Sequence, residues 1–254
     1  MLSEERKLLI LKKVNENKSV TVQELKAYLN TSESTIRRAI TDLNREGKLV
    51  KVYGGAIALE AKGNAKELSV QEKEKINRQE KQRIAKYAAS LIEKGDYVFI
   101  DSGTTTEYMI EYITQKDATY VTNAVSHAKN LARKGMKVLL IGGELKENTE
   151  AIVGADAILN IQKYHFTKGF FGTNGVSAKL GFSTPDIREA MIKKVAIENT
   201  LMGHRYILSD HDKFGKSSPV TFSDFGGTVV ITDRKPDDIY MNMMDIRVSQ
   251  ENGI

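Results

Sequence analysis

TSESTIRRAITDLNREGKL, residues 31–49, is the stretch that decides how this chain is organised. At 100° per residue, the apolar side chains of Ile36, Ile40 and Leu43 fall on one side of a helix, and Arg37 lies at its margin. The opposite side gathers short hydroxyls and arginines, namely Ser34, Arg38, Thr41 and Arg45. A merely solvated face is typically rich in Glu and Lys, whereas hydroxyl and guanidinium groups grip phosphates and contact base edges. The stretch therefore predicts a helix that contacts nucleic acid.

Two shorter helices are expected before this one. The apolar positions Leu9, Ile10 and Val14 predict the first helix, and the polar run NENKSVT ends it. The second begins after Thr21, with Glu24 three residues later in the spacing of a capping box. Two short helices, a turn and a third helix with a polar, basic outer face are typical of a helix-turn-helix. A plain three-helix bundle with a basic face is the alternative that periodicity alone leaves open.

The run KLVKVYGGAIAL, residues 48–59, predicts a β-hairpin directly after the third helix. Two β-prone segments flank a Gly54-Gly55 turn, and a hairpin in this place forms the wing of a winged helix. We expect the DNA contacts to come from the third helix and the wing, which contain Ser32, Ser34, Thr35, Arg37, Arg38, Thr41, Arg45, Lys48, Lys51, Tyr53, Gly54 and Gly55.

The composition is compatible with a DNA-binding protein and argues against disulfide-bonded, metal-binding, secreted and membrane-spanning classes. The chain has 254 residues and a net charge of +5, and residues 1–60 hold 11 Lys/Arg against 8 Asp/Glu. There is no cysteine, and the four histidines show no metal-ligand spacing, so we expect neither disulfides nor a metal site. The N-terminal residues carry charges from the fourth position on, unlike a signal peptide, and no run is apolar enough for a membrane span. We expect a cytoplasmic protein.

The remainder of the chain predicts an α/β domain. Residues 59–78 are polar and charged and indicate a partly helical linker between a DNA-binding domain at 1–58 and a second domain at 79–254. Apolar strands are expected at 97–101, 119–123, 137–143, 166–172, 205–210 and 228–232. Helices are expected from residue 81 and at 105–114, 124–134, 150–161 and 185–201. Apolar strands that alternate with helices are typical of a parallel sheet covered on both faces.

Polar clusters follow five of these strands, and ligands bind at the carboxyl ends of such sheets. Backbone N–H groups and hydroxyls at a helix start suit a phosphate, while Asn, Asp and Lys suit sugar hydroxyls. The expected ligand is a small phosphorylated polyol, bound by Asp101, Ser102, Gly103, Thr104, Thr105, Thr106, Thr122, Asn123, Gly142, Gly143, Gly172, Thr173, Asn174, Asp210 and Lys213. Singly, each cluster is weak evidence, because a Gly-Thr-Thr turn is more often an ordinary helix cap than a phosphate site and Asn-Gly is commonly just a turn. The chain has no GxxxxGK[ST] or GxGxxG nucleotide loop.

These residues also resemble a known family. The run SESTIRR at 32–38 and the Gly-Gly-Ala at 54–56 are similar to the N-terminal domain of the DeoR-type bacterial repressors of sugar-catabolism operons. The stretches DSGTTT, VTNA, IGGEL, GTNGV and SDHDKFGK resemble the effector domain of the same family, so the resemblance covers nearly the whole chain. It implies a winged helix-turn-helix followed by a phosphosugar sensor similar in fold to ribose-5-phosphate isomerase and glucosamine-6-phosphate deaminase.

Within that family, GTNGV followed by Thr184-Pro185-Asp186 looks closest to the repressors of fructose-phosphotransferase operons. The effector implied by this resemblance is fructose-1-phosphate. Repressors of the lactose/tagatose-6-phosphate pathway are the alternative. The identity of the sugar rests on the resemblance and not on any spacing in the sequence.

An active phosphosugar isomerase or deaminase is the competing class of function. Enolisation needs a carboxylate base and a cation for the developing oxyanion, and Asp101, Asp210, Asp212 and Lys213 are available parts. An enzyme, however, has no need of a winged helix. We therefore expect a repressor without catalytic residues or cofactor, acting as a dimer or tetramer on double-stranded operator DNA and controlled by a phosphorylated sugar.

Overall fold

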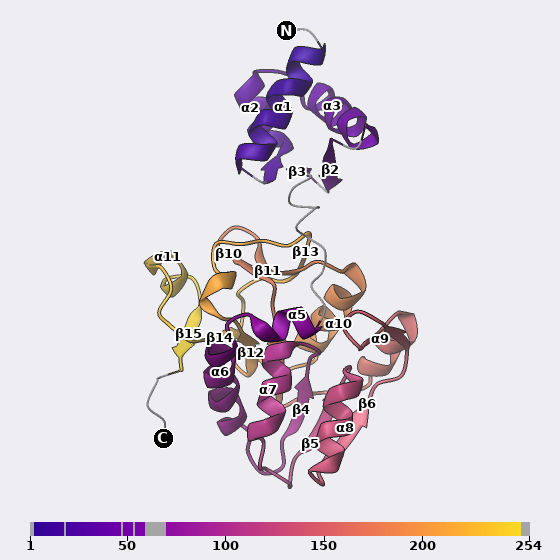
Figure 1. The fold of residues 1–254 in the computed structure, drawn as a ribbon, viewed down its shortest axis with the longest axis vertical. Coiled ribbons are helices and arrows are strands. Elements are labelled where there is room, and N and C mark those ends of the chain that lie inside the picture. Colours follow the sequence, from indigo (N-terminus) through magenta and orange to yellow (C-terminus); the bar gives the residue numbers. More distant parts are fainter. Residues whose placement is uncertain (1–2, 18, 47, 53, 59–69, 250–254) are drawn as a thin grey trace. The chain divides into compact units, whose positions relative to one another are not determined.

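The computed structural model describes residues 3–17, 19–46, 48–52, 54–58 and 70–249. Contacts within the chain divide it into two units, Met1–Glu67 and Leu68–Ile254, which are drawn in Figure 1. Of the predicted linker 59–78, residues 59–69 lie outside the described residues. Residues 70–75 form a helix, and Arg78 begins the next one. The two units are described separately.

The first unit is a three-helix winged domain. Its elements are α1 Ser3–Asn17, β1 Ser19–Thr21, α2 Val22–Leu29, α3 Glu33–Arg45, β2 Leu49–Val52 and β3 Gly55–Ala58. The capping box of Thr21 and Glu24 is present at α2, and Asn30 ends that helix in the left-handed conformation. The predicted helix-turn-helix and wing are confirmed. The short strand β1 was not expected; it pairs with β3 and completes a sheet of order β1-β3-β2.

A single apolar core holds this unit together. Ile10 from α1, Leu25 from α2, Ile36 and Leu43 from α3, and Leu49 from β2 are all at most 1% exposed. The spacing of the α3 residues is that of one helix face, so burial of this face turns the polar face outward. Packing of the core therefore fixes which side of α3 is free to contact a partner.

The second unit contains a seven-stranded parallel sheet of order β15-β14-β12-β9-β4-β5-β6. Its strands are β4 Tyr97–Ile100, β5 Thr119–Thr122, β6 Lys137–Leu140, β9 Lys168–Gly172, β12 Arg205–Leu208, β14 Thr228–Thr232 and β15 Asp245–Val248. The helices are α5 Val70–Lys75, α6 Arg78–Ser90, α7 Thr104–Tyr112, α8 Val125–Arg133, α9 Ala155–Ile161, α10 Ile187–Glu198 and α11 Asp238–Met241, with a 3-10 turn at His211–Lys213. The predicted parallel α/β architecture is confirmed.

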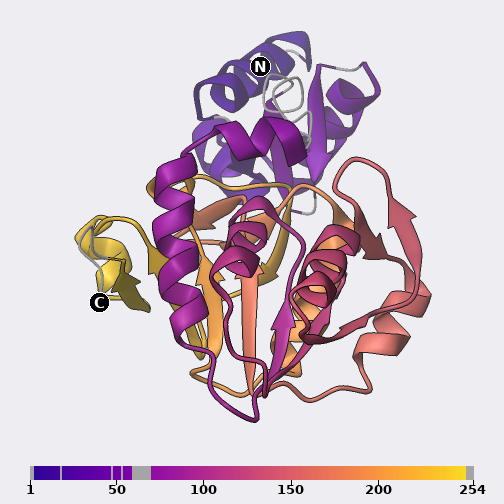
Figure 2. The same cartoon turned by 60° about the horizontal axis from the view of Figure 1, so that its bottom comes forward.

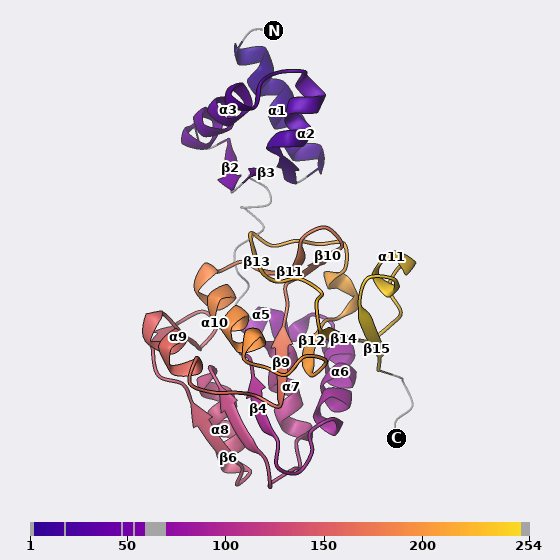
Figure 3. The same ribbon diagram turned by 180° about the vertical axis from the view of Figure 1, so that it is seen from behind.

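Helices cover both faces of the sheet. Figure 1 shows α6, α7 and α8 in front of the strands, and Figure 3 shows α9 and α10 in front when the molecule is seen from behind. Because successive side chains of a strand point to opposite faces, Val98 and Ile100 pack with α6, α7 and α8, whereas Phe99 packs on the side of α9 and α10. The five central strands, β14, β12, β9, β4 and β5, are buried on both faces, which explains their continuous apolar sequence. The edge strands β6 and β15 are more exposed.

Smaller elements were not foreseen from the sequence. A second, antiparallel sheet of order β10-β11-β13 is formed by Gly175–Ser177, Gly181–Thr184 and Val220–Ser223. The expectation of one helix over 150–161 is wrong. Ala151–Val153 is a buried strand, β8, paired with β7 Glu144–Lys146, and α9 begins only at Ala155. Gly154, with φ +96°, breaks the chain between strand and helix.

Candidate functional site

The outer face of α3 begins with three clustered hydroxyls. Ser32 caps the helix: its Oγ accepts a hydrogen bond from the backbone N–H of Thr35 at 3.2 Å. The same oxygen lies 2.7 Å from Thr35 Oγ1 and 3.0 Å from Ser34 Oγ. Ser32 and Ser34 are exposed and Thr35 is half-buried. Their hydroxyls therefore stand at the positive end of the helix dipole, where a phosphate oxygen is favoured.

The two adjacent arginines of α3 are held differently. Both nitrogens Nε and Nη2 of Arg37 donate to Glu33 Oε1, at 2.8 and 2.6 Å, and this pair lowers the pKa of Glu33. Arg45 forms a longer exposed pair with Asp42. Arg38 is exposed, and within the described part of the chain its guanidinium has no hydrogen-bond or ion-pair partner. Among these arginines, Arg38 is the one that meets no internal competition for a base or phosphate.

The wing is tied to α3 by polar contacts. Lys51 Nζ donates to Thr41 Oγ1 at 3.0 Å, and Thr41 Oγ1 donates to the carbonyl of Arg37. The backbone N–H of Lys51 donates to Asn44 Oδ1 at 2.9 Å. Lys48 lies 2.8 Å from Glu46, which Lys7 also contacts, and the two lysines lower the pKa of the Glu46 carboxyl to about 2. Lys48, Lys51 and Thr41 thus lie on one continuous exposed surface with α3.

The glycines of the predicted wing have backbone roles. Gly54 has φ +83°, a conformation that favours glycine. Gly55 is buried where β3 pairs with β1, and a Cβ there would lie 2.1 Å from the carbonyl oxygen of Val20. Gly55 is therefore needed for strand packing and presents no side chain to DNA. Tyr53 lies outside the described residues.

In the second unit, four neighbouring strands, β12, β9, β4 and β5, end at one edge of the sheet. Asp101 follows β4 and is 1% exposed, and its carboxylate forms an ion pair with Lys193 of α10. The N–H of Gly172, at the end of β9, donates to Asp101 Oδ2 at 3.0 Å, and Lys193 Nζ donates to the Gly172 carbonyl at 3.0 Å. Burial raises the pKa of the Asp101 carboxyl, and the nearby Lys193 ammonium opposes that rise.

The loop after β4 is also bound to the end of β5. Asn123 Oδ1 accepts the N–H of Ser102 at 2.9 Å, and Asn123 Nδ2 donates to Ser102 Oγ at 3.3 Å. Beyond this loop, α7 begins at Thr104, so its first N–H groups lie beside Ser102 in the chain. Thr104 and Thr105 are largely buried at this helix start. These contacts bring Asp101, Ser102 and Asn123 together, as expected from the sequence.

Several other expected residues have side chains committed to the backbone. Thr106 Oγ1 donates to the carbonyls of Asp101 and Gly103, at 2.6 and 2.8 Å. Thr122 Oγ1 accepts the N–H of Ala124, and Thr173 Oγ1 donates to the carbonyl of Gly175. Among the other expected residues, Asn174 accepts from Thr184 through its Oδ1, and Gly142 and Gly143 lie exposed after β6. The hydroxyl hydrogens of Thr106 and Thr173 are thus engaged with backbone carbonyls, whereas Thr122 uses its oxygen as an acceptor.

The end of β12 carries a second polar cluster. Asp210 is 1% exposed, and its Oδ2 lies 3.8 Å from Lys213 Nζ. Asn77, between α5 and α6, donates from Nδ2 to Asp210 Oδ1 at 3.2 Å and to Asp212 Oδ2 at 2.7 Å. Lys81 is 3% exposed, and burial lowers its pKa to about 8 although Asp210 opposes this. Lysines beside two carboxylates at a strand end suit a ligand with both a phosphate and hydroxyls.

Sequence reasoning missed three of these residues: Asn77, Lys81 and Lys193. Lys81 and Lys193 come from helices and Asn77 from the turn between α5 and α6, whereas the motifs were sought at strand ends. A signal existed for Lys193, because it lies among Ala190, Ile192, Ala196 and Ile197 on the buried face of α10, where a lysine needs a partner. Asn77 and Lys81 lie in a charged segment that gives no such signal.

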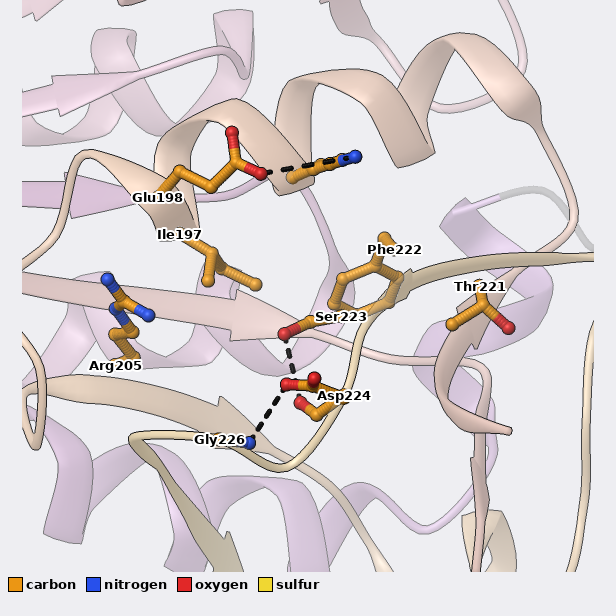
Figure 4. Close-up of a pocket in the computed structure, with 9 residues that line it drawn as sticks. Ile197, Glu198, Arg205, Thr221, Phe222, Ser223, Asp224 and Gly226 are labelled. Atoms are coloured by element: carbon orange, nitrogen blue, oxygen red, sulfur yellow. Dashed lines mark hydrogen bonds and ion pairs between the residues drawn. The ribbon is translucent and has the colours of Figure 1, made fainter. Parts of the chain in front are cut away.

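A separate hollow of about 340 Å³ lies between the C-terminal half of α10 and β13 (Figure 4). Its lining holds two cations, Lys194 and Arg205, and two carboxylates, Glu198 and Asp224, so the formal charges cancel. Glu198 lies 4.0 Å from Lys194, and Asp224 Oδ1 accepts a backbone N–H at 2.9 Å. Arg205 begins β12, at the opposite end from the strand-end cluster. The hollow is therefore distinct from that cluster and poorly suited to an anion.

Two further properties concern the described residues alone. They contain no group of three or more His, Cys, Asp or Glu side chains arranged to hold a metal ion. Their helices include none with the length and apolar character needed to span a membrane.

Comparison with known proteins gives matches along both units. Residues 6–62 match the DeoR-like helix-turn-helix domain, and residues 76–234 match the DeoR C terminal sensor domain. The HTH-type transcriptional regulator FruR of Bacillus subtilis (strain 168) is 41% identical over 233 residues, 91% of each chain. A lactose phosphotransferase system repressor of Staphylococcus aureus (strain NCTC 8325 / PS 47) is 37% identical over 228 residues, 88% of this chain and 89% of the relative.

Among solved structures, ribose 5 phosphate isomerase A from Neisseria gonorrhoeae aligns with 54% of this chain and 53% of its own, with a TM-score of 0.39 and 15% identity. A likeness of this size says nothing of activity. The two domain matches and the nearly full-length relatives do identify the family. The chain belongs to the DeoR family of helix-turn-helix transcriptional regulators.

Proposed function

We propose that this chain is a repressor of a sugar-uptake or sugar-catabolism operon, released from or tightened on its operator by a phosphorylated sugar. One observation carries the proposal: a chain with a DeoR-like helix-turn-helix also has buried Lys193 and Asp101, and Lys81 and Asp210, at the strand ends of its sensor unit. An anion with hydroxyls matches that mixture of cations and hydrogen-bond acceptors.

On the DNA side, α3 is the proposed recognition helix. Arg38, without an internal partner among the described residues, is assigned to a base edge, together with Ser34, Thr35 and Thr41. Arg37, Lys48 and Lys51 are assigned to phosphates, because their side chains lie toward the wing or are already paired. A homo-oligomer, dimer or tetramer, places two such helices in successive major grooves.

On the effector side, the phosphate is assigned to the start of α7 at Ser102–Thr106 and to Lys213. The sugar hydroxyls are assigned to Asn123, which is hydrogen-bonded to Ser102 beside that helix start, and to Asp210, which lies near Lys213 after β12. Repulsion of a ligand phosphate by Asp210 is offset by the neighbouring Lys81 and Lys213. Apart from Lys81 of α6, these groups follow the ends of three strands, β4, β5 and β12, so the sheet holds them in place.

Fructose-1-phosphate is the proposed sugar, supported by the similarity to FruR and by the GTNGV and TPD stretches. The similarity to lactose phosphotransferase repressors supports tagatose-6-phosphate as the second candidate. No feature of the strand-end contacts separates the two sugars, because both present a phosphate and several hydroxyls.

Isothermal titration of the purified protein with fructose-1-phosphate, tagatose-6-phosphate, fructose-6-phosphate and free fructose tests the effector assignment. We expect one phosphosugar to bind and free fructose not to bind. Lys213→Ala should weaken the phosphosugar by at least about tenfold, since a charge-assisted contact contributes about 1.5–3 kcal/mol. Lys216→Ala is the matched control, because Lys216 is an exposed lysine of the same loop. Equal affinities for the wild type and Lys213→Ala would remove Lys213 from the site.

A further inference from the structure

Asn77 forms an unusual corner between α5 and α6. Its φ of 50° and ψ of 43° place it in the left-handed region, which asparagine adopts more readily than most residues other than glycine. It occupies the N-cap position of α6, yet its side chain makes no capping hydrogen bond to that helix. The side-chain amide is therefore available for contacts elsewhere.

Those contacts reach 133 and 135 residues along the chain. The Asn77 amide donates to Asp210 Oδ1 at 3.2 Å and to Asp212 Oδ2 at 2.7 Å. Hydrogen bonds to ionised carboxylates are about twice as strong as neutral ones. One amide group thus joins the α5–α6 corner to both carboxylates of the loop after β12.

The corner itself is braced as one piece. Lys81, one turn along α6, donates from its backbone N–H to the Asn77 carbonyl at 3.0 Å and from Nζ to the carbonyl of Lys73 in α5. Tyr108 of α7 donates from its hydroxyl to the carbonyl of Glu74 at 3.3 Å. In Figure 2, α5 lies across the end of the unit and meets α6 at a sharp angle. In the chain, α5 is the first described element after the segment that leads from the DNA-binding unit.

A ligand hydroxyl that donates to Asp210 Oδ1 competes with the Asn77 amide for this oxygen. Asp210 Oδ1 already accepts the Asn77 amide and the backbone N–H of Asp212, at 3.2 and 3.0 Å. A carboxylate oxygen has about two lone-pair sites, so a sugar hydroxyl that donates to this oxygen displaces one of the two donors. The backbone N–H is fixed by the turn, and the Asn77 amide makes the longer bond. Asn77 is therefore the donor that yields.

We propose that Asn77 is a latch that transmits occupancy of the sugar-phosphate site to α5 and so to the DNA-binding unit. In the empty protein the latch holds the α5–α6 corner on the β12 loop. In the occupied protein the hydroxyl replaces the amide at Asp210, so the corner keeps only its bond to Asp212 and is held less firmly on the loop. This inference rests on the proposed function, because it requires a ligand hydroxyl at Asp210. The coupling between effector and DNA is limited by the difference in affinity between the two corner states.

The test compares three proteins: wild type, Asn77→Gly and Glu150→Gly. Glycine keeps the left-handed backbone at position 77 and removes only the amide. Glu150, at φ 51°, is the matched control, an exposed residue of positive φ in the same unit without contact to Asp210. For each protein, fluorescence anisotropy gives the dissociation constant of DNA from upstream of its own operon, without and with saturating fructose-1-phosphate. Titration calorimetry gives the affinity for the sugar.

Allosteric coupling factors are about 5- to 150-fold, and we expect a factor in this range for the wild type and for Glu150→Gly. For Asn77→Gly the factor should fall close to 1, while the sugar binds at least as tightly as before. A wild-type response that Asn77→Gly retains in full would overturn the latch alone. A wild type that binds no phosphosugar would overturn both the latch and the proposed function.

Hydrogen exchange of the wild-type protein gives a second readout that needs no variant. Addition of fructose-1-phosphate should speed exchange in peptides that cover residues 70–81, because the corner loses one of the two hydrogen bonds by which Asn77 attaches it to the β12 loop. Unchanged exchange in these peptides, with the sugar bound, would overturn the latch.

Discussion

At the residue level, Asp101 and Lys193 form a buried ion pair in the sensor unit. Both side chains are nearly fully buried, with 1% and 4% of the side-chain surface exposed. Removing two charges from water is costly, and the pair recovers that cost only if both partners remain. The backbone groups of Gly172 supply the additional hydrogen bonds that such a pair needs. The pair therefore ties the end of β4, the end of β9 and α10 together.

We expect Lys193→Met to lower the free energy of unfolding by about 3–5 kcal/mol at pH 7.5, because Asp101 is left buried without its cation. The loss should shrink as the pH falls toward 4, since the isolated buried carboxyl takes up a proton and becomes neutral. Urea unfolding followed by circular dichroism measures both effects. The control is Lys194→Met, on the exposed side of the same helix, which should change stability by no more than about 0.5 kcal/mol. A double variant, Asp101→Asn with Lys193→Met, that is no more stable than the single variant would contradict this explanation.

Lys81 makes the free energy of unfolding depend on pH in the direction opposite to that of an unpaired, buried Asp101. Burial lowers its pKa to about 8 from the ordinary 10.5, so between these values the unfolded chain binds more protons than the folded one. Stability contributed by this residue therefore rises with pH from about 8 to about 10.5. The difference in unfolding free energy, wild type minus Lys81→Met, should increase over that window. A difference that is flat or falls with pH would show that Lys81 is not held in a desolvated position.

At the level of elements, β1 and β3 form a close strand pair that only glycine permits at position 55. A Cβ there would lie 2.1 Å from the Val20 carbonyl oxygen, far inside contact distance. We expect Gly55→Ala to destabilise the DNA-binding unit by about 1–3 kcal/mol or more, as overpacking does. Gly54→Ala, which meets no atom within 4 Å, should lose only the smaller cost of its positive φ. Thermal unfolding of the full chain, read by loss of DNA binding, compares the two. Equal losses would contradict the packing argument.

Within α3, the difference between Arg37 and Arg38 predicts different losses. Arg38→Ala should cost about 1–3 kcal/mol of operator binding and relax sequence preference, as expected for an arginine that contacts a guanine. Arg37→Ala should weaken operator and random DNA alike and reduce the salt dependence, as expected for a phosphate contact. Anisotropy titrations on both DNAs at several salt concentrations separate the outcomes. An equal loss on both DNAs for Arg38→Ala would make Arg38 a phosphate contact.

The elements predicted well from the sequence are those with strong hydrophobic periodicity and clear capping or turn residues at their ends. The amphipathic face of α3 and the alternation of apolar strands with helices indicated the architecture. In such a sheet, parallel strands bring their carboxyl ends to one edge. The rule that strand ends meet at one edge correctly grouped Asp101, Ser102 and Asn123. Periodicity, in contrast, failed at Ala151–Val153, because three residues are too few to distinguish a strand from the start of a helix.

Residues that act through tertiary packing were not predictable in this way. Lys193 meets Asp101 across 92 residues of sequence, and Asn77 meets Asp210 across 133. Neither pairing follows from spacing, because it depends on how α10 and the α5–α6 corner pack against the sheet. The hydroxyls of Thr106, Thr122 and Thr173 were expected to face a ligand, but each is engaged with the backbone. Local motifs indicate the edge of the sheet, and packing decides which atoms remain free.

At the level of the whole molecule, control of DNA binding by a sugar requires that one chain couples two separate units. The α3 surface and the strand-end cluster belong to different units, so a ligand at one alters binding at the other only through a shift between two states of the protein. Such coupling is reciprocal: a sugar that weakens DNA binding is itself bound more weakly by the DNA complex. This reciprocity holds for either sign of control.

The most direct test of the central claim is an anisotropy titration of fluorescent DNA from upstream of the protein's own operon, at fixed salt, with and without fructose-1-phosphate. The account predicts specific binding whose dissociation constant changes by at least about fivefold with the phosphosugar and not with free fructose. Specific DNA binding that no phosphorylated sugar alters would contradict the assignment of the sensor unit. Absence of any preference for this DNA over random sequence would contradict the assignment of α3.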